Sequence, residues 1–333
     1  MAHFRLSAFL VATGVFLGVN PAFAQDRSSF YKSRTFSYII SAGAGGGYDL
    51  YGRLVAEFMQ RQLPGSTFVV KNMAGAGHLI GANALYASPP DGYTLGSFST
   101  GLIYNQISKN ASVRFDLTKM SWIGKAGTDP RVVVISATSP IKTFDEFLLQ
   151  KELQNFAASG LGSASYVEMI LLSRTMKLPI KVLTGYQGSA DQLAMRRGEI
   201  VGTIGSRSSL QQFVNNGYGR FIAQIGGLDT DVPQMSAWAR DESGANSIAL
   251  IQSQGDIARL TAGPPGIPAD HLNILIDAYR NALNDPDLQA RAIKFGYPIE
   301  PAYGEEVAKI INKALQQSDE TTTLLTEALK PQK

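Results

Sequence analysis

A repeated succession of strand-like segment, glycine-rich loop and helix-like segment constrains the fold of this chain most strongly. Residues 36–41, 67–71 and 93–97 have strand composition, and the first two segments run into Gly43-Ala44-Gly45-Gly46-Gly47 and Gly75-Ala76-Gly77. We expect a helix after each of these two loops. Strands that alternate with helices predict a mostly parallel sheet with helices on both faces, and a ligand crevice beyond the carboxyl ends of the strands.

The same succession begins again near Arg131 and predicts a second lobe. Its expected strands are 132–136, 155–159, 181–183 and 200–204. Its expected glycine-rich loops are 160–165 and 184–189. A helix is expected over 143–153, with Thr143 as its cap and Glu146 three residues on.

From Ile248 the pattern returns to the first lobe and ends in two helices, over 269–284 and 304–330. We therefore predict an α/β protein of two lobes, each a mostly parallel sheet flanked by helices. The predicted first lobe contains residues 25–128 and 252–333, and the predicted second lobe contains residues 129–251.

The first 24 residues have the pattern of a secretory signal peptide. A weakly basic start precedes an apolar run over 6–19 that is too short to span a bilayer, and Ala22-Phe23-Ala24 is typical of a cleavage site. We expect cleavage after Ala24 and a mature periplasmic chain that begins at Gln25. No cysteine follows the cleavage site, so no lipid anchor is expected there.

Composition excludes several other classes of protein. The formal net charge of +3 offers no electrostatic footprint for nucleic acid, and the absence of cysteine excludes disulfides and thiol catalysis. The mature histidines His78 and His271 have no metal-ligand spacing, and exposed helix positions are expected for both. We expect no cofactor, no metal, no membrane-embedded segment in the mature chain, and a monomer.

The glycine-rich loops suggest how this chain binds a solute. A helix N-terminus presents free backbone N–H groups and partial positive charge, and glycine lets a ligand approach the backbone closely. Facing loops of two lobes therefore suit an anion even without arginine. The same glycines also suit tight strand-to-helix turns, which is the simpler explanation for any single loop. The scarcity of basic residues in these loops leaves open a partly apolar ligand such as an aromatic acid.

An ordered series of motifs resembles the substrate-binding proteins of tripartite tricarboxylate transporters, the TctC or Bug family. The motifs are Ser41 to Asp49 with Arg53, Asn72 to Gly77 with Gly81, Pro90 to Leu95, Ser159 to Ser163, Tyr186 to Ser189, Asp231-Val232-Pro233 and Gly263 to Pro268. The resemblance implies a venus-flytrap fold of the periplasmic-binding-protein type, no enzymatic activity, a carboxylate ligand and transient docking on membrane transporter subunits. Gln187 stands where the family commonly has a basic residue, and such departures suggest that the second lobe decides ligand choice.

The ligand-binding residues that the loops and the resemblance imply come from both lobes. They are Gly43, Ala44, Gly45, Gly46, Tyr48, Asp49, Gly75, Ala76, Gly77, Ser99, Thr100, Gly160, Gly162, Ser163, Tyr186, Gly188, Ser189 and Ser206. Asp49 lies just inside a helix start, where complementing the helix dipole is an equally good explanation.

Three rival functions follow from the same sequence. A nucleotide-dependent oxidoreductase fits poorly, because the loops lack the G-x-G-x-x-G spacing and an acid after the second strand. A secreted α/β hydrolase lacks a G-x-S-x-G elbow. A ligand-loaded partner of a membrane sensor stays open, because it would use the same liganded state as a transport protein.

Overall fold

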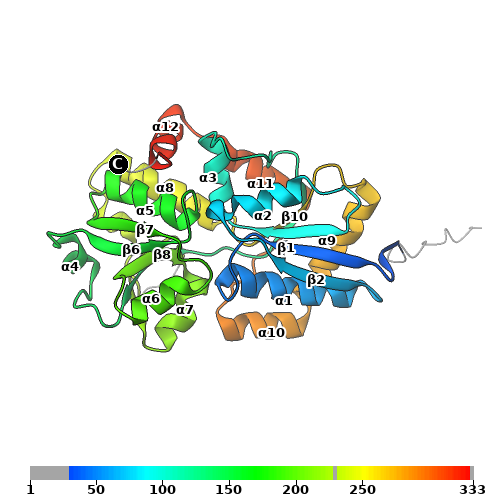
Figure 1. The fold of residues 1–333 in the computed structure, drawn as a ribbon, viewed down its shortest axis with the longest axis horizontal. Helices are drawn as coiled ribbons and strands as arrows, with labels where there is room; N and C mark the ends of the chain where they lie inside the picture. The colour runs from blue at the N-terminus through cyan, green and yellow to red at the C-terminus, as the bar shows by residue number, and fades with distance from the viewer. Residues whose placement is uncertain (1–29, 228–230, 331–333) are drawn as a thin grey trace, which may run out of the picture.

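The computed structural model describes residues 30–227 and 231–330. The predicted signal peptide and its cleavage site lie outside these residues. The described chain forms two α/β lobes that lie side by side, each built on its own β-sheet with helices on both faces (Figure 1). The predicted two-lobed α/β fold is therefore confirmed.

The first sheet has six strands in the order β11-β4-β10-β3-β1-β2. They are β1 (Thr35–Ile40), β2 (Thr67–Asn72), β3 (Thr94–Phe98), β4 (Ser121–Lys125), β10 (Leu260–Gly263) and β11 (Ala302–Tyr303). The strands β2, β1 and β3 are parallel neighbours, whereas β10 lies antiparallel between β3 and β4. The sheet is therefore mixed, with a parallel part that carries the first two glycine-rich loops.

The second sheet has five strands in the order β7-β6-β8-β5-β9. They are β5 (Arg131–Ser136), β6 (Gln154–Ala158), β7 (Ile180–Thr184), β8 (Gly202–Ser206) and β9 (Gly219–Ile225). The strands β7, β6 and β8 are parallel, and β5 is antiparallel to both β8 and β9. Arg131 at the start of β5 pairs with Ser206 at the end of β8, so both lie at the loop-bearing edge.

Helices cover both sheets. They are α1 (Gly47–Gln62), α2 (Leu79–Tyr86), α3 (Gly101–Ile107), α4 (Phe144–Leu148), α5 (Ala164–Thr175), α6 (Ala190–Arg196), α7 (Arg207–Asn215), α8 (Glu242–Gly255), α9 (Ala269–Asn284), α10 (Pro286–Phe295), α11 (Glu305–Leu315) and α12 (Asp319–Ala328), with short 3₁₀ segments at Ala76–His78 and Met235–Trp238. Among the described helices, none is both long and apolar enough to cross a membrane.

Two of the expected helices differ from those observed. The helix expected over 143–153 begins as predicted, because Thr143 accepts a hydrogen bond from the Glu146 N–H, but α4 ends at Leu148. The single helix expected over 304–330 is two helices, α11 and α12. The Ser318 side chain accepts a hydrogen bond from the Thr321 N–H, and this cap starts α12 as a separate helix.

Two chain segments connect the lobes directly. Residues 126–130 lead from β4 to β5, and residues 256–259 lead from α8 to β10. The two segments are hydrogen-bonded to one another, with Ala126 N–H donating to Arg259 O. The first segment also bonds to the end of α8, with Asp129 N–H donating to Gly255 O. The predicted lobe boundary at 128/129 falls in the first segment. The boundary at 251/252 falls inside α8, and α8 packs on α5, β5 and β9 of the second lobe. The division of the chain at these two boundaries stays a prediction.

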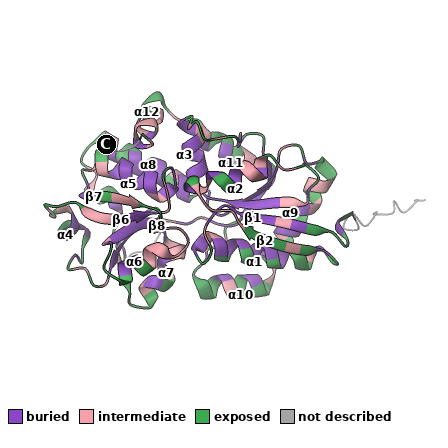
Figure 2. Ribbon diagram, in the orientation of Figure 1, coloured by how far each residue is buried: buried purple, intermediate pink, exposed green. Residues whose placement is uncertain are grey.

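The buried apolar core is continuous between the lobes on one side. A single cluster contains Leu102 and Tyr104 of α3 together with Val167 and Leu171 of α5, and these two helices pack together. The C-terminal α12 packs on both of them. Separate clusters fill the other face of each sheet, and the strands are largely buried (Figure 2). This packing places the loop-bearing edges of the two sheets opposite one another.

Candidate functional site

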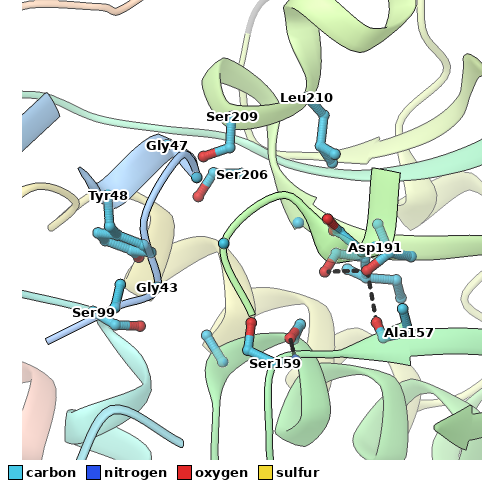
Figure 3. A pocket seen from close by; sticks show the side chains of 18 of the residues that line it. Gly43, Gly47, Tyr48, Ser99, Ala157, Ser159, Asp191, Ser206, Ser209 and Leu210 are labelled. Carbon is cyan, nitrogen blue, oxygen red and sulfur yellow. Dashed lines mark hydrogen bonds between the residues drawn. The ribbon is translucent and has the colours of Figure 1, made fainter. Parts of the chain in front are cut away.

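A cavity lies where the loop-bearing edges of the two sheets meet (Figure 3). It encloses about 690 Å³ that no atom fills, part of it open to solvent. Its lining comes from both lobes: Ala42, Gly43, Gly46, Gly47, Tyr48, His78, Ser99, Arg131, Ala157, Ser159, Ala164, Ser165, Gly188, Asp191, Gln192, Thr203, Ile204, Gly205, Ser206, Ser209 and Leu210. The crevice expected beyond the strand ends is thus an interlobe cavity.

Three helices of at least nine residues begin at this cavity. Gly47 and Tyr48 open α1, Ala164 and Ser165 open α5, and Ser209 lies in the first turn of α7. The first N–H groups of a helix have no partner within the helix and carry partial positive charge. Their convergence makes the cavity favourable for an anion.

Arg131 contributes the only guanidinium among the described residues of the lining. Its Nε and Nη2 donate to Glu168 Oε2 at 2.9 and 2.6 Å, and its Nη1 donates to Ser206 Oγ at 2.8 Å. Both charged side chains are almost fully buried, at 6% exposure for Arg131 and 0% for Glu168. These contacts use three of the five guanidinium N–H groups, so Arg131 retains donor capacity at the cavity wall.

Burial and mutual attraction set the charge of this pair. Burial raises the pKa of Glu168, and the adjacent guanidinium opposes that shift. For Arg131, burial acts against the charge, but Glu168 outweighs it and raises the pKa further. Arg131 therefore stays a cation, held in a fixed orientation by a buried carboxylate.

His78 occupies a different position from the exposed helix site expected from the sequence. Its side chain lines the cavity, and Nδ1 lies 2.5 Å from the Ser41 carbonyl oxygen. A carbonyl oxygen only accepts, so Nδ1 carries the proton and Nε2 is an acceptor in the neutral ring. Burial lowers the pKa of His78, which favours that neutral form. His271 is also not a free surface residue, since its ring stacks on Phe30.

Asp49 organises the first loop from behind the cavity. Its Oδ2 accepts from the Gly45 N–H at 2.9 Å, and its Oδ1 accepts from Arg53 Nε and Asn72 Nδ2 at 2.9 and 2.8 Å. Burial tends to raise the pKa of Asp49, but these hydrogen bonds outweigh it and hold the pKa below its usual value. Asp49 is 3% exposed and is not part of the lining.

The glycine loops of the two lobes touch one another beside the cavity. A Cβ added to Gly188 would lie 2.2 Å from Ala44 O, and one added to Gly77 would lie 2.3 Å from Leu161 O. Both distances are too short for any side chain to fit. Asn105 adds a bridge, with Nδ2 donating to Gly162 O at 2.7 Å. The structure therefore has the two lobes closed on one another.

The predicted ligand-binding residues fall into three groups. Those that line the cavity are Gly43, Gly46, Tyr48, Ser99, Gly188 and Ser206. Those at the contact between lobes, or beside it, are Ala44, Gly45, Gly75, Ala76, Gly77, Gly160, Gly162, Ser163 and Ser189. Those that face the interior of one lobe are Asp49, Thr100 and Tyr186. As ligand contacts, all eighteen stay predictions.

Several lining residues were absent from the predicted set. In the sequence pattern Arg131 marks only the start of the second lobe, and Ser159 and Ser165 flank a loop from which Gly160, Gly162 and Ser163 are predicted instead. Asp191 and Gln192 open a short helix, and Thr203 lies within β8. The expectation of an anion site without arginine therefore omits one cationic side chain. Among the described residues no group of acidic and histidine side chains could hold a metal ion.

Comparison with known proteins identifies the family to which this chain belongs. The family model described as "Tripartite tricarboxylate transporter family receptor" (TctC) matches residues 52–325. Protein BugT of Bordetella pertussis is 26% identical over 229 residues, covering 66% of this chain and 69% of BugT.

Two solved structures share the fold. The periplasmic binding protein BugD is 22% identical with a TM-score of 0.74, covering 90% of this chain and 98% of BugD. MatC of Rhodopseudomonas palustris, solved with bound malate, is 19% identical with a TM-score of 0.72, covering 89% of this chain and 99% of MatC.

Proposed function

Because this chain belongs to the tripartite tricarboxylate transporter receptor (TctC) family, we propose that it is a periplasmic binding protein that captures a small carboxylate between its lobes. It then delivers this solute to a membrane transporter of the tripartite tricarboxylate type. The match to the family model over residues 52–325 supports the class of protein. The cavity supports the chemistry of the ligand.

One observation carries the carboxylate assignment. The N-termini of α1, α5 and α7 converge on a cavity whose wall also contains the Arg131 guanidinium. Helix N-termini favour anions, and a guanidinium with free N–H groups matches the geometry of a carboxylate. The malate in the related MatC structure is consistent with this chemistry.

The closed arrangement supports a capture mechanism. A carboxylate docks on the loops of one lobe, and closure brings the helix N-termini of the other lobe onto it. Backbone rotation in the two connecting segments, 126–130 and 256–259, moves one lobe relative to the other. The ligand shifts the equilibrium toward the closed form only by its greater affinity for that form.

A thermal-stability panel tests the proposal. Purified mature protein is heated with mono-, di- and aromatic carboxylates, and with sugars and amines as comparison classes. At a concentration ~100 times its dissociation constant, a ligand of the folded state stabilises by about 2.7 kcal/mol. We expect at least one carboxylate to give a shift of that size. Stabilisation by a sugar or an amine, with none by any carboxylate, contradicts the proposal.

A matched pair of variants locates the site. Ser165→Asp adds a negative charge at the second residue of α5, inside the cavity, and Ser243→Asp makes the same change at the second residue of α8, away from it. Both positions tolerate an acid, because it complements the helix dipole. Ser165→Asp should abolish carboxylate stabilisation and Ser243→Asp should preserve it. Equal responses of the two variants would place the carboxylate elsewhere.

Delivery is tested separately. The loaded protein is added to vesicles that contain the membrane subunits of a tripartite tricarboxylate transporter, and uptake of the radiolabelled carboxylate is followed. We expect uptake that requires this protein. Docking on a sensor kinase ectodomain, without support of uptake, would favour the sensing alternative.

A further inference from the structure

Asp191 places an acidic side chain in a cavity otherwise suited to an anion. It lies in the first turn of α6, and its Oδ1 accepts a hydrogen bond from the Gln192 N–H at 2.8 Å. Its side chain is part of the cavity lining. In Figure 3 it lies on the second-lobe side, away from Gly47 and Tyr48 of α1.

Asp191 has no cationic partner within residues 30–227 and 231–330. The only hydrogen bond that it accepts from another described residue comes from the Gln192 backbone. Burial raises the pKa of Asp191 to about 6, with the backbone N–H groups of Gln192 and of Asp191 itself opposing the shift. At neutral pH the carboxylate is thus largely ionised, although burial without a cation is unfavourable.

The other charges at the cavity are already paired. Arg131, the other charged side chain in the described lining, is paired with Glu168. The Ser209 hydroxyl accepts a hydrogen bond from Arg259, whose charge is paired with Asp129. The same cavity therefore contains partial positive charge from the N-termini of α1, α5 and α7 and the negative charge of Asp191, which has no described cationic partner. A ligand with charges of both signs matches this layout.

We propose that Asp191 binds an ammonium group of the same solute whose carboxylate is held at the helix N-termini, so that the site selects an amino carboxylate over a dicarboxylate of equal length. The inference rests on the proposed carboxylate-binding function and narrows its ligand class. An ammonium group supplies the missing cation to Asp191. A second carboxylate there would face a like charge in a partly desolvated site, which disfavours binding.

A purely structural role makes a different prediction. An acid in the first turn of a helix stabilises the helix through its dipole, whatever the ligand. In that case replacing Asp191 would change stability but leave the relative affinities of ligands unchanged. The ratio of affinities therefore separates the two roles.

The experiment measures those ratios by isothermal titration at pH 7.5. Matched sets of straight-chain mono-, di- and ω-aminocarboxylates with three to eight carbons, together with the common amino acids, are titrated into the wild-type protein and Asp191→Asn. Asparagine keeps the size of the side chain and an oxygen for the Gln192 N–H. Asp319→Asn is the control, because Asp319 lies in the first turn of α12 and is exposed.

We expect at least one amino carboxylate to bind the wild type tenfold or more tightly than its matched mono- and dicarboxylates. Asp191→Asn should reduce that ratio at least tenfold, and Asp319→Asn should leave it unchanged. Failure of every amino carboxylate to exceed its matched dicarboxylate, or an unchanged ratio in Asp191→Asn, overturns the inference. Carboxylates that still bind in that case leave the proposed function intact, whereas binding of no carboxylate by the wild type refutes both.

Discussion

Asp129 and Arg259 lie on the two different segments that connect the lobes, and their side chains form a buried ion pair with Nη2 and Oδ2 2.5 Å apart. The same Nη2 donates to Ser208 Oγ and Ser209 Oγ of α7, at 2.6 and 3.1 Å. The guanidinium also lies over the Tyr48 ring, with Cζ 4.6 Å from its centroid. One side chain thus joins both connections to residues of each lobe that line the cavity.

The first prediction concerns this ion pair. Arg259→Met leaves Asp129 buried without its cation, and breaking a buried pair in this way costs about 3–5 kcal/mol. Chemical denaturation should show a loss of that size. The double variant Asp129→Asn with Arg259→Met removes the stranded charge and should recover part of the loss. A double variant no more stable than Arg259→Met would mean that the pair matters only through its packing.

The second prediction concerns closure of the lobes. A methyl group at Gly188 would lie 2.2 Å from Ala44 O of the opposite lobe, so Gly188→Ala cannot close as observed. Gly198→Ala is the control, because Gly198 also has positive φ but its added Cβ would meet no described atom within 4 Å. Both variants should lose about 1–2 kcal/mol from backbone strain.

Only Gly188→Ala should lose affinity, by tenfold or more, and it should keep a larger radius of gyration in small-angle scattering with ligand present. Equal affinity losses in Gly188→Ala and Gly198→Ala would assign the effect to strain and not to the contact between lobes.

The third prediction concerns Asp49. Its carboxylate holds the Gly45 N–H, Arg53 and Asn72, and charged hydrogen bonds contribute about 1.5–3 kcal/mol each. Because its folded-state pKa is lowered, this stabilisation is present above the ordinary carboxyl pKa and is lost as the pH falls. Asp49→Ala should be less stable than wild type at pH 7, by an amount that shrinks toward pH 3.

Carboxylate affinity of Asp49→Ala should also fall, because the first loop loses its anchor, while far-UV circular dichroism stays unchanged. Unchanged affinity would show that the backbone alone holds the loop in place.

The fourth prediction concerns Asp191 and pH. Its folded-state pKa is raised from 3.8 to about 6, so the folded protein binds the proton more tightly than the unfolded chain does. Stability from this group is therefore full below pH ~4 and is lost as the pH rises through about 6. Over that interval the wild type should lose up to about 3 kcal/mol relative to Asp191→Asn, from a shift of roughly two pKa units. Parallel pH profiles of the two proteins would contradict the raised pKa.

Local patterns predicted much of the architecture. The two successions of strand, glycine loop and helix identified β1 to β3 and β5 to β8, and Thr143 capped its helix as expected. The strands β4, β9, β10 and β11 were missed. Leu260–Gly263 pairs antiparallel with strands more than a hundred residues away in the sequence. A four-residue segment does not contain enough pattern to predict such pairing.

The candidate site was predicted less completely for the same reason. A glycine-rich loop in the sequence predicts a helix N-terminus, and Gly43, Gly46 and Gly188 of these loops line the cavity. Arg131 and Thr203 are strand residues, and the antiparallel pairing of β5 with β8 places Arg131 beside Ser206. In the sequence, Asp191 cannot be distinguished from any other acid in the first turn of a helix. In the structure, its burial and the lack of a described cationic partner distinguish it.

The sequence by itself determined the α/β class, the two-lobed plan and the position of helix N-termini after glycine loops, because these depend on residue periodicity and local backbone freedom. Only the tertiary structure decided which loops line a cavity and which touch the opposite lobe, and that Arg131 and Asp191 belong to the same site. Those relationships depend on how distant strands pair and how the lobes close. The physical quantities that follow from them, burial and charge pairing, arise only after the chain has folded.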